Sequence, residues 1–244
     1  MSIAEKLTTI AENMQKVYDA GKAAADDSGG YEEGYSQAES DFWDALTNSG
    51  NRVFYEYAFS RSGFEYIRPQ HKIVPTSRSI GMFSFSQKLK KIEKQYFDLS
   101  KCQVTTQTAG TGGHYSTFYW CKALEVFEDV GLQPGGYYMT WNSCHKLHTI
   151  EVMRVLETTK FDAPFTDCYA LENLTIEGTI GQNGFVVKYS PLSHDSLMSI
   201  ITALKDYSTD TSGTQWVVTL GTENLNKLTD AEKAMATQKG WTLA

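Results

Sequence analysis

The stretch WNSCHKLHTI, residues 141–150, carries an aromatic residue, a cysteine, a leucine and an isoleucine at intervals of three. The same skeleton, ending in a large apolar residue, recurs in residues 118–127 and 165–174. Residues 83–92 are a weaker copy with serine in the cysteine position. One short structural unit is therefore repeated along the middle of the chain.

The spacing of the copies indicates the kind of repeat. Cys121, Cys144 and Cys168 lie 23 and 24 residues apart, whereas the interval from Ser86 to Cys121 is longer. A fixed period of about 20–29 residues is typical of leucine-rich repeats, whose units stack and share one continuous core. We therefore expect an α/β fold with a leucine-rich-repeat-like solenoid over residues 81–190, and an insertion before Cys121.

Three of the four cysteines occupy one position of the repeat, and Cys102 lies between two copies. One cysteine per repeat is not a zinc knuckle, and the absence of a secretory signal disfavours disulfides. The spacing predicts a column of buried free thiols that act as small hydrophobic groups. Cys144 stands beside His145, but adjacent residues rarely form a nucleophile and base, so no catalytic residue is predicted.

The leucine-to-isoleucine part of each repeat is predicted to be a short strand, and the residues between should align on one exposed face. Glu93, Glu128 and Glu151 then occupy neighbouring positions of one column. Like charges placed side by side across strands destabilise a sheet. The column is either part of a binding face or a solvated acidic face.

Residues 1–49 are expected to be helical, either as one kinked helix or as two helices broken near Gly29 and Gly30. Their apolar residues alternate in steps of four and three, which favours a coiled-coil seam, although the helix could instead fold back on the repeats. The predicted oligomerisation residues are Ile3, Leu7, Ile10, Met14, Val17, Tyr31, Tyr35 and Phe42.

Two further segments are expected to cap the ends of the array, residues 50–80 and residues 191–244. In the second, Ser193 should begin a helix, and residues 215–220 read as a strand. Thr229 stands three residues before Glu232, which predicts a capping box, and Gly240 should end that helix. The C-terminal cap is therefore predicted to be α/β.

Candidate binding residues lie in and after a Gly- and Thr-rich loop over residues 102–115. Exposed Tyr, Trp and Asn form binding surfaces because rigid amphipathic rings bury much area at low entropic cost. The alternative is that these rings pack between the turns. The candidate ligand-binding residues are His114, Tyr115, Tyr119, Trp120, Tyr137, Tyr138, Asn142, His148 and Glu151.

Several function classes find no support in the sequence. Phosphate-loop, dinucleotide and zinc-hydrolase motifs are missing, so neither enzyme activity nor a cofactor nor a metal is predicted. The net charge of −7 argues against nucleic acid as a partner. Neither a signal peptide nor an apolar run of about 20 residues is present, which argues against membrane insertion.

The repeats, with FYWCKAL at 118–124 and FTDCYALENL at 165–174, resemble the BspA-like branch of leucine-rich repeat proteins. Both ends of the chain are similar to short members of that group encoded by phages and prophages of gut Firmicutes. The resemblance implies a phage tail-associated host-recognition or receptor-binding protein, located in the virion after cytoplasmic assembly. It also implies a homo-oligomer, with a trimer favoured, and as partners a bacterial surface protein or glycan and other tail proteins.

The alternative is a bacterial leucine-rich repeat interaction or adhesion protein with no virion role, in which the N-terminal helix merely caps the array.

Overall fold

The computed structural model describes residues 59–69, 72–76, 78–102 and 114–244. The chain divides into two compact units, Met1–Val53 with Arg68–Ile73, and Phe54–Ile67 with Val74–Ala244. All the strands and helices given below belong to the second unit. The predicted seam residues and most of the predicted Gly- and Thr-rich loop lie outside the described residues.

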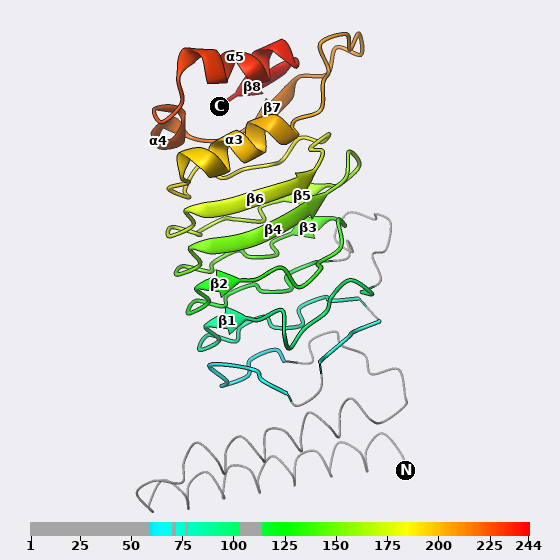
Figure 1. The fold of residues 1–244 in the computed structure, drawn as a ribbon, viewed down its shortest axis with the longest axis vertical. Helices are drawn as coiled ribbons and strands as arrows, with labels where there is room; N and C mark the ends of the chain where they lie inside the picture. Colours follow the sequence, from blue (N-terminus) through cyan, green and yellow to red (C-terminus); the bar gives the residue numbers. More distant parts are fainter. Residues whose placement is uncertain (1–58, 70–71, 77, 103–113) are drawn as a thin grey trace, which may run out of the picture. The chain divides into compact units, whose positions relative to one another are not determined.

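The second unit is a mixed α/β structure whose strands pair in parallel. Its largest sheet contains β1 (Lys91–Ile92), β2 (Val126–Phe127), β4 (Thr149–Val155) and β6 (Asn173–Gly178), in the order β1-β2-β4-β6. Figure 1 shows these strands one above the other, each from a different copy of the skeleton. The predicted strands are confirmed.

The register of this sheet follows the sequence skeleton. Ile92 pairs with Phe127, Phe127 with Ile150, and Ile150 with Leu174. These four side chains are all buried. The last residue of each copy therefore lies beside that of the next copy.

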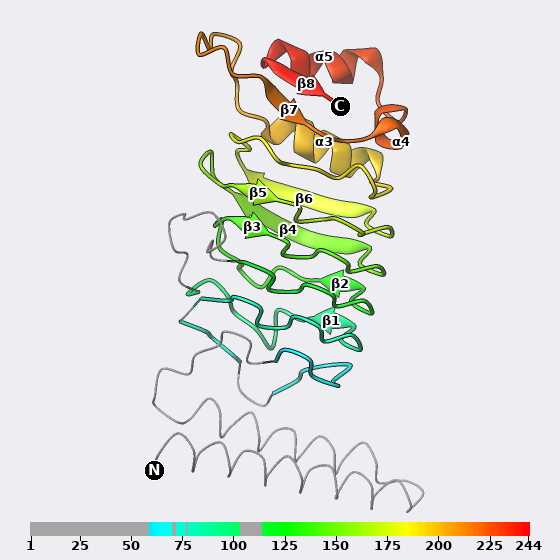
Figure 2. The same ribbon diagram turned by 180° about the vertical axis from the view of Figure 1, so that it is seen from behind.

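A second, two-stranded sheet pairs β3 (Tyr137–Tyr138) with β5 (Phe161–Asp162), also in parallel. The view from behind in Figure 2 shows these two short strands. They were not predicted, because they lie outside the repeated skeleton and two residues alone are too few to produce an alternating pattern. Their pairing carries Tyr137 and Tyr138 into the interior.

Stacked aromatic rings form the centre of the core. The ring of Phe118 lies parallel to Phe83 at a centroid distance of 5.2 Å and to Trp141 at 6.2 Å. Trp141 in turn stacks on Phe165 at 5.5 Å. All four rings are fully or almost fully buried, so the aromatic position of the skeleton is a core position, as predicted.

The cysteine position has a second role besides packing. The thiol of Cys144 donates to the carbonyl oxygen of Phe118, and that of Cys168 to the carbonyl oxygen of Trp141, both at 3.1 Å. Each thiol thus reaches the aromatic residue one repeat earlier. Ser86 donates in the same way to Phe59 at 2.6 Å, which explains why serine can replace cysteine there. All four cysteines are free and buried, as predicted for Cys121, Cys144 and Cys168.

Left-handed backbone recurs at two fixed positions of the repeat. The residue two before each core aromatic has a φ of about 50°: Gly81 55°, Ser116 52°, Met139 49° and Ala163 47°. The residue two after it has a φ near 60°: Arg61 60°, Phe85 61°, Trp120 62°, Ser143 62° and Asp167 59°. These turns stack through backbone hydrogen bonds, as in Phe85 N to Tyr119 O at 2.7 Å and Trp120 N to Asn142 O at 2.9 Å.

The C-terminal cap contains α3 (His194–Ala203), β7 (Trp216–Val218), α4 (Thr222–Leu225), α5 (Asp230–Gln238) and β8 (Trp241–Leu243). The predicted Ser193 cap, the capping box at Thr229 and the left-handed Gly240 after α5 are confirmed. Helix α4 was not predicted, since four residues carry no helical period. Within the described part of the chain, no helix is long and apolar enough to cross a membrane.

Helix α3 covers the edge of the sheet beyond β6. The Leu174 N–H donates to the Ser196 hydroxyl and the Ile176 N–H to the Ser199 hydroxyl, both at 2.8 Å. The Ser196 hydroxyl donates in turn to the Glu172 carbonyl oxygen at 2.9 Å. Two side chains therefore satisfy the groups that a further strand would have paired, which protects an edge that could otherwise aggregate.

Candidate functional site

Two of the three glutamates in the predicted column, Glu128 and Glu151, have neighbours that offset their charge, and Glu93 is buried. The carboxylate of Glu128 pairs with Lys91 Nζ at 2.5 Å and accepts from the Lys94 N–H at 2.9 Å. Glu151 accepts from the Asp129 N–H at 3.1 Å. Burial alone would raise the pKa of Glu128, but these hydrogen bonds hold it below its ordinary value. The expected repulsion is thus offset.

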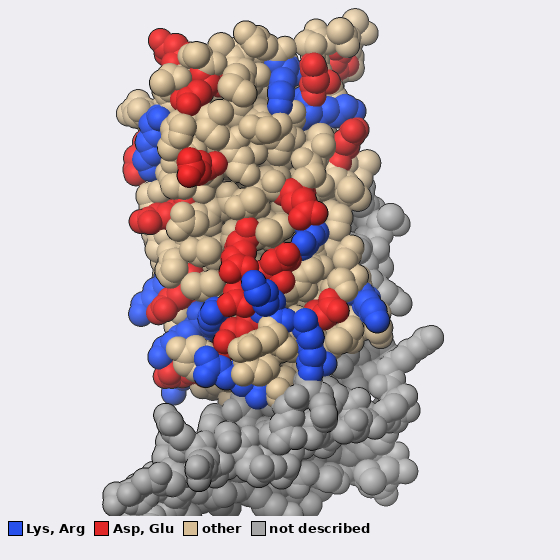
Figure 3. All heavy atoms as spheres, in the orientation of Figure 1, with Lys and Arg blue, Asp and Glu red and all other residues tan. Residues whose placement is uncertain are grey.

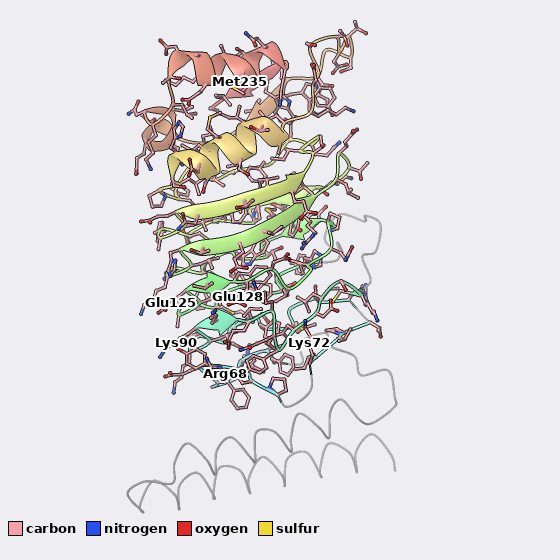
Figure 4. The ribbon with its side chains drawn as sticks, in the orientation of Figure 1. Arg68, Lys72, Lys90, Glu125, Glu128 and Met235 are labelled. Carbon is pink, nitrogen blue, oxygen red and sulfur yellow. The ribbon has the colours of Figure 1, made fainter. Side chains whose placement is uncertain are left out.

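Further ion pairs extend over the same face. Arg154 donates to both carboxylate oxygens of Asp129, at 2.5 and 2.8 Å, and its Nη2 lies 3.4 Å from Glu177. Acidic and basic side chains are interleaved on this face in Figure 3, and Figure 4 places Lys90 and Glu125 at neighbouring turns. These charged groups mainly bind one another, so they are not free to form a group of side chains that point toward a common ligand.

Three of the nine candidate binding residues are buried, which corrects their prediction as surface contacts. His114 and Tyr137 are inaccessible to solvent, and Tyr138 is 6% exposed. His114 Nε2 lies 2.7 Å from the carbonyl oxygen of Gln133, which can only accept, so Nε2 carries the proton. Its Nδ1 accepts from Ser79 at 2.8 Å. Burial lowers the pKa of His114 to about 4, so the ring is a neutral core group.

Tyr137 is buried for a similar reason. Its ring stacks on Trp141 at 5.5 Å and on His114 at 5.4 Å. Its hydroxyl donates to the Arg154 carbonyl oxygen at 2.7 Å. The Tyr137 ring is therefore part of the core. For this residue the alternative interpretation, that the ring packs between the turns, is correct.

Tyr119 and Trp120 instead meet Phe85 at the surface. The centroid of Phe85 lies 5.3 Å from Tyr119 and 5.7 Å from Trp120, and Tyr119 and Trp120 are 6.2 Å apart. All three side chains are half-buried. Together they form a continuous aromatic surface across two neighbouring repeats.

Two cations lie against these rings. Lys122 Nζ is 4.2 Å from the centre of the Trp120 ring, and the guanidinium carbon of Arg61 is 5.5 Å from that of Phe85. Such cation–π contacts are worth about 0.5–1 kcal/mol at exposed sites. Phe85, Tyr119, Trp120, Arg61 and Lys122 are called the aromatic ridge below.

The choice of residues on the ridge carries a conformational cost. Phe85 and Trp120 both adopt a left-handed backbone, which costs an L-residue about 1–2 kcal/mol and suits Gly, Asn or Asp best. The equivalent positions of the next two repeats hold Ser143 and Asp167. Two large half-exposed aromatic rings are therefore present at positions where stability favours a small or polar residue.

The other predicted residues lie around the ridge or on the sheet. Tyr115 and Asn142 are half-buried, and Asn142 accepts from the Ser143 hydroxyl at 2.8 Å. His148 is exposed on the sheet, with Nδ1 2.9 Å from the Thr149 hydroxyl. Among the nine, Tyr119 contacts Trp120 through its ring at the surface, and His114 contacts Tyr137 in the core.

The sequence reasoning missed three members of the ridge. Phe85 lies two residues after Phe83, as Trp120 lies two residues after Phe118, so alignment of the repeats could have revealed it. Arg61 occupies the same position, two residues after Phe59, but its placement over a ring, like that of Lys122, depends on how the turns stack.

Cys144, which stands beside His145 in the sequence, is a buried free thiol. Burial raises the pKa of Cys144 well above its ordinary value, so its thiol remains protonated and away from solvent. Among the described residues, no three His, Cys, Asp or Glu side chains gather as metal ligands would. An open hollow on the C-terminal cap is lined by Leu225, Lys233, Thr237, Thr242 and Leu243, with no pair of titratable groups for acid–base work.

Comparison with known proteins found no family model, no curated protein and no solved structure that matches the chain.

Proposed function

We propose that the chain is a non-enzymatic binding protein that presents a leucine-rich-repeat-like solenoid. Support for the solenoid comes from four parallel strands in register with the sequence skeleton and from turns that stack repeat upon repeat. Support for binding comes from the aromatic ridge, because Phe85 and Trp120 occupy left-handed positions at the expense of stability.

The biological setting that we favour is host recognition by a phage tail. The motivation is the sequence resemblance to BspA-like proteins of phages of gut Firmicutes, together with the heptad seam predicted for residues 1–49. In this proposal the helical segment is an oligomeric anchor, and the ridge contacts a protein or glycan on the bacterial surface.

The binding proposal is tested with fluorescently labelled full-length protein and intact cells of gut Firmicutes. Trp120→Ser and Tyr119→Ser should each reduce cell binding at least tenfold, which corresponds to about 1.4 kcal/mol. Met235→Ser is the matched control, since Met235 is 38% exposed on α5 in the C-terminal cap (Figure 4), and should change nothing. Unchanged binding by both ridge variants would exclude the ridge as the contact.

The second candidate is a bacterial leucine-rich repeat interaction or adhesion protein, favoured by the same repeats without the tail role. Mass spectrometry of purified virions from a producing strain separates the two. Detection of the chain in virions supports the tail role, whereas its recovery only with the bacterial cells supports the second candidate.

A further inference from the structure

The two cations of the aromatic ridge differ from those of the sheet face. Lys90, Lys91 and Lys94 each lie within 4.0 Å of a glutamate carboxylate. For Arg61 and Lys122, by contrast, the structure shows cation–π contacts and no carboxylate partner among the described residues. In a chain of net charge −7, two unneutralised cations on one small surface are available to an anion.

The rings supply the other half of the recognition. Parallel turns repeat at about 4.8 Å, and the Phe85 and Trp120 centroids lie 5.7 Å apart across two of them. This spacing is comparable with the length of one pyranose unit in an unbranched saccharide. The C–H face of a pyranose stacks on aromatic rings, and a carboxylate attached to the same sugar would lie at the edge of the ring, where a neighbouring Lys or Arg can reach it.

We infer that the aromatic ridge binds an unbranched polysaccharide that contains hexuronic acid. Successive sugar rings lie over Phe85 and Trp120, with Tyr119 beside them. Lys122 and Arg61 move from the ring faces to the sugar carboxylates and exchange a cation–π contact for a charge-assisted hydrogen bond. The inference rests on the proposed binding function and specifies its ligand class.

The test is calorimetric titration of the full-length protein with a galacturonic acid hexamer. The uncharged comparison is cellohexaose, and the comparison without sugar rings is poly(glycerol phosphate). Uronate should bind at least tenfold more tightly than cellohexaose, and its affinity should fall between 50 and 500 mM salt, about as Debye screening predicts.

Variants assign the binding to the ridge. Trp120→Ser should lose at least tenfold in uronate affinity, and its fold is expected to persist because serine holds the same position at Ser143. Lys122→Gln should lose threefold to tenfold together with part of the salt dependence, without altering the rings. Lys160→Gln removes an exposed cation elsewhere and should have no effect.

Three outcomes would overturn the inference, and a fourth would overturn only host recognition. Equal affinity for cellohexaose refutes the charge recognition, and binding of poly(glycerol phosphate) alone refutes the role of the sugar rings. If cells are bound through Trp120 but uronate is not, the ligand class is wrong and the proposed function stands. If uronate binds through Trp120 and Lys122 but cells are not bound, the inference stands and host recognition fails.

Discussion

Single residues in this protein accept unfavourable backbone conformations because the stacked turns require them. Each repeat places a left-handed residue two positions before and two positions after its core aromatic. The first position holds Gly81 in one repeat and Ala163 in another, at nearly the same φ of 55° and 47°. The conformation therefore belongs to the repeat and not to the residue type, and the cost depends on which residue occupies it.

Replacing Ala163 with glycine should stabilise the fold. A left-handed alanine costs about 1–2 kcal/mol, and the greater freedom of glycine in the unfolded chain returns part of that, so we expect a net gain of roughly 0.5–1 kcal/mol. Urea unfolding measures it. Ala170→Gly is the control, because Ala170 does not have a positive φ and should lose about 0.4–1 kcal/mol. A loss at Ala163 as large as that at Ala170 would contradict the conformational argument.

His114 should make stability depend on pH between about 6.5 and about 4. The ring is neutral in the folded protein because burial lowers its pKa from 6.5 to about 4, so the unfolded chain binds more protons in that range. The contribution is complete above pH 6.5 and is lost as the pH falls toward 4, to a total of about 3 kcal/mol.

Urea unfolding from pH 7.5 to 4 checks this dependence against His114→Gln. Glutamine can still donate to the Gln133 carbonyl oxygen but does not titrate, so the variant should lose about one proton from the slope of unfolding free energy against pH. Identical slopes for the two proteins would show that His114 is charged, or accessible, in the folded state.

At the scale of elements, the protein ends its sheet with a helix that supplies hydroxyl acceptors. One face of helix α3 is buried against β6, with Leu197, Ile200 and Ile201 in the core. The side chains of Ser196 and Ser199 lie against the edge of the strand. The spacing of three from Ser196 to Ser199 brings both hydroxyls to one side of the helix. An apolar helix could bury the same area but would leave the β6 N–H groups without acceptors.

Removal of these hydroxyls should be costly. Ser196→Ala should lose about 1–3 kcal/mol, because the buried Leu174 N–H then has no acceptor, and Ser199→Ala should lose less at the partly buried Ile176 N–H. Thr202→Ala on the exposed side of α3 is the control and should be neutral or slightly stabilising. The stabilities of the three variants are compared by thermal unfolding. Equal stability of all three would contradict the proposal that these serines cap the edge of the sheet.

A glycine at the end of β6 fixes how β4 and β6 end together. Gly178 has a φ of 111°, and a Cβ there would lie 1.9 Å from the Val155 carbonyl oxygen. Gly178→Ala should therefore lose more than about 3 kcal/mol, as expected for strain at a special backbone position. Gly213, which has open space around its Cβ position, provides the comparison for a positive φ alone. Equal losses at the two glycines would mean that the close backbone approach is unimportant.

At the scale of the whole molecule, the association of chains rests on the predicted seam of residues 1–49, which lies outside the described residues. If the seam forms a coiled coil, full-length protein should sediment as an oligomer. The double variant Leu7→Asp with Ile10→Asp should sediment as a monomer, because buried carboxylates oppose helix association. A full-length monomer, or an oligomer unaffected by the double variant, would show that the helix does not act as an anchor.

The sequence by itself determined the features that depend on near neighbours. The core skeleton, the strand at the end of each copy, the buried thiols and the helix caps at Ser193 and Thr229 follow from periodicity and capping chemistry, which act over a few residues. The short strands β3 and β5 and helix α4 escaped prediction because they lie outside the repeated skeleton and are shorter than the period that would otherwise reveal them.

Only the tertiary structure decided which aromatic residues face solvent. Tyr137 and Tyr119 have the same side chain, yet Tyr137 is buried by the pairing of β3 with β5 and Tyr119 is half-exposed on a turn. The same holds for the cations, since Lys91 meets Glu128 in the neighbouring repeat and Lys122 meets a ring. These outcomes depend on contacts between residues far apart in the chain, which local periodicity does not encode.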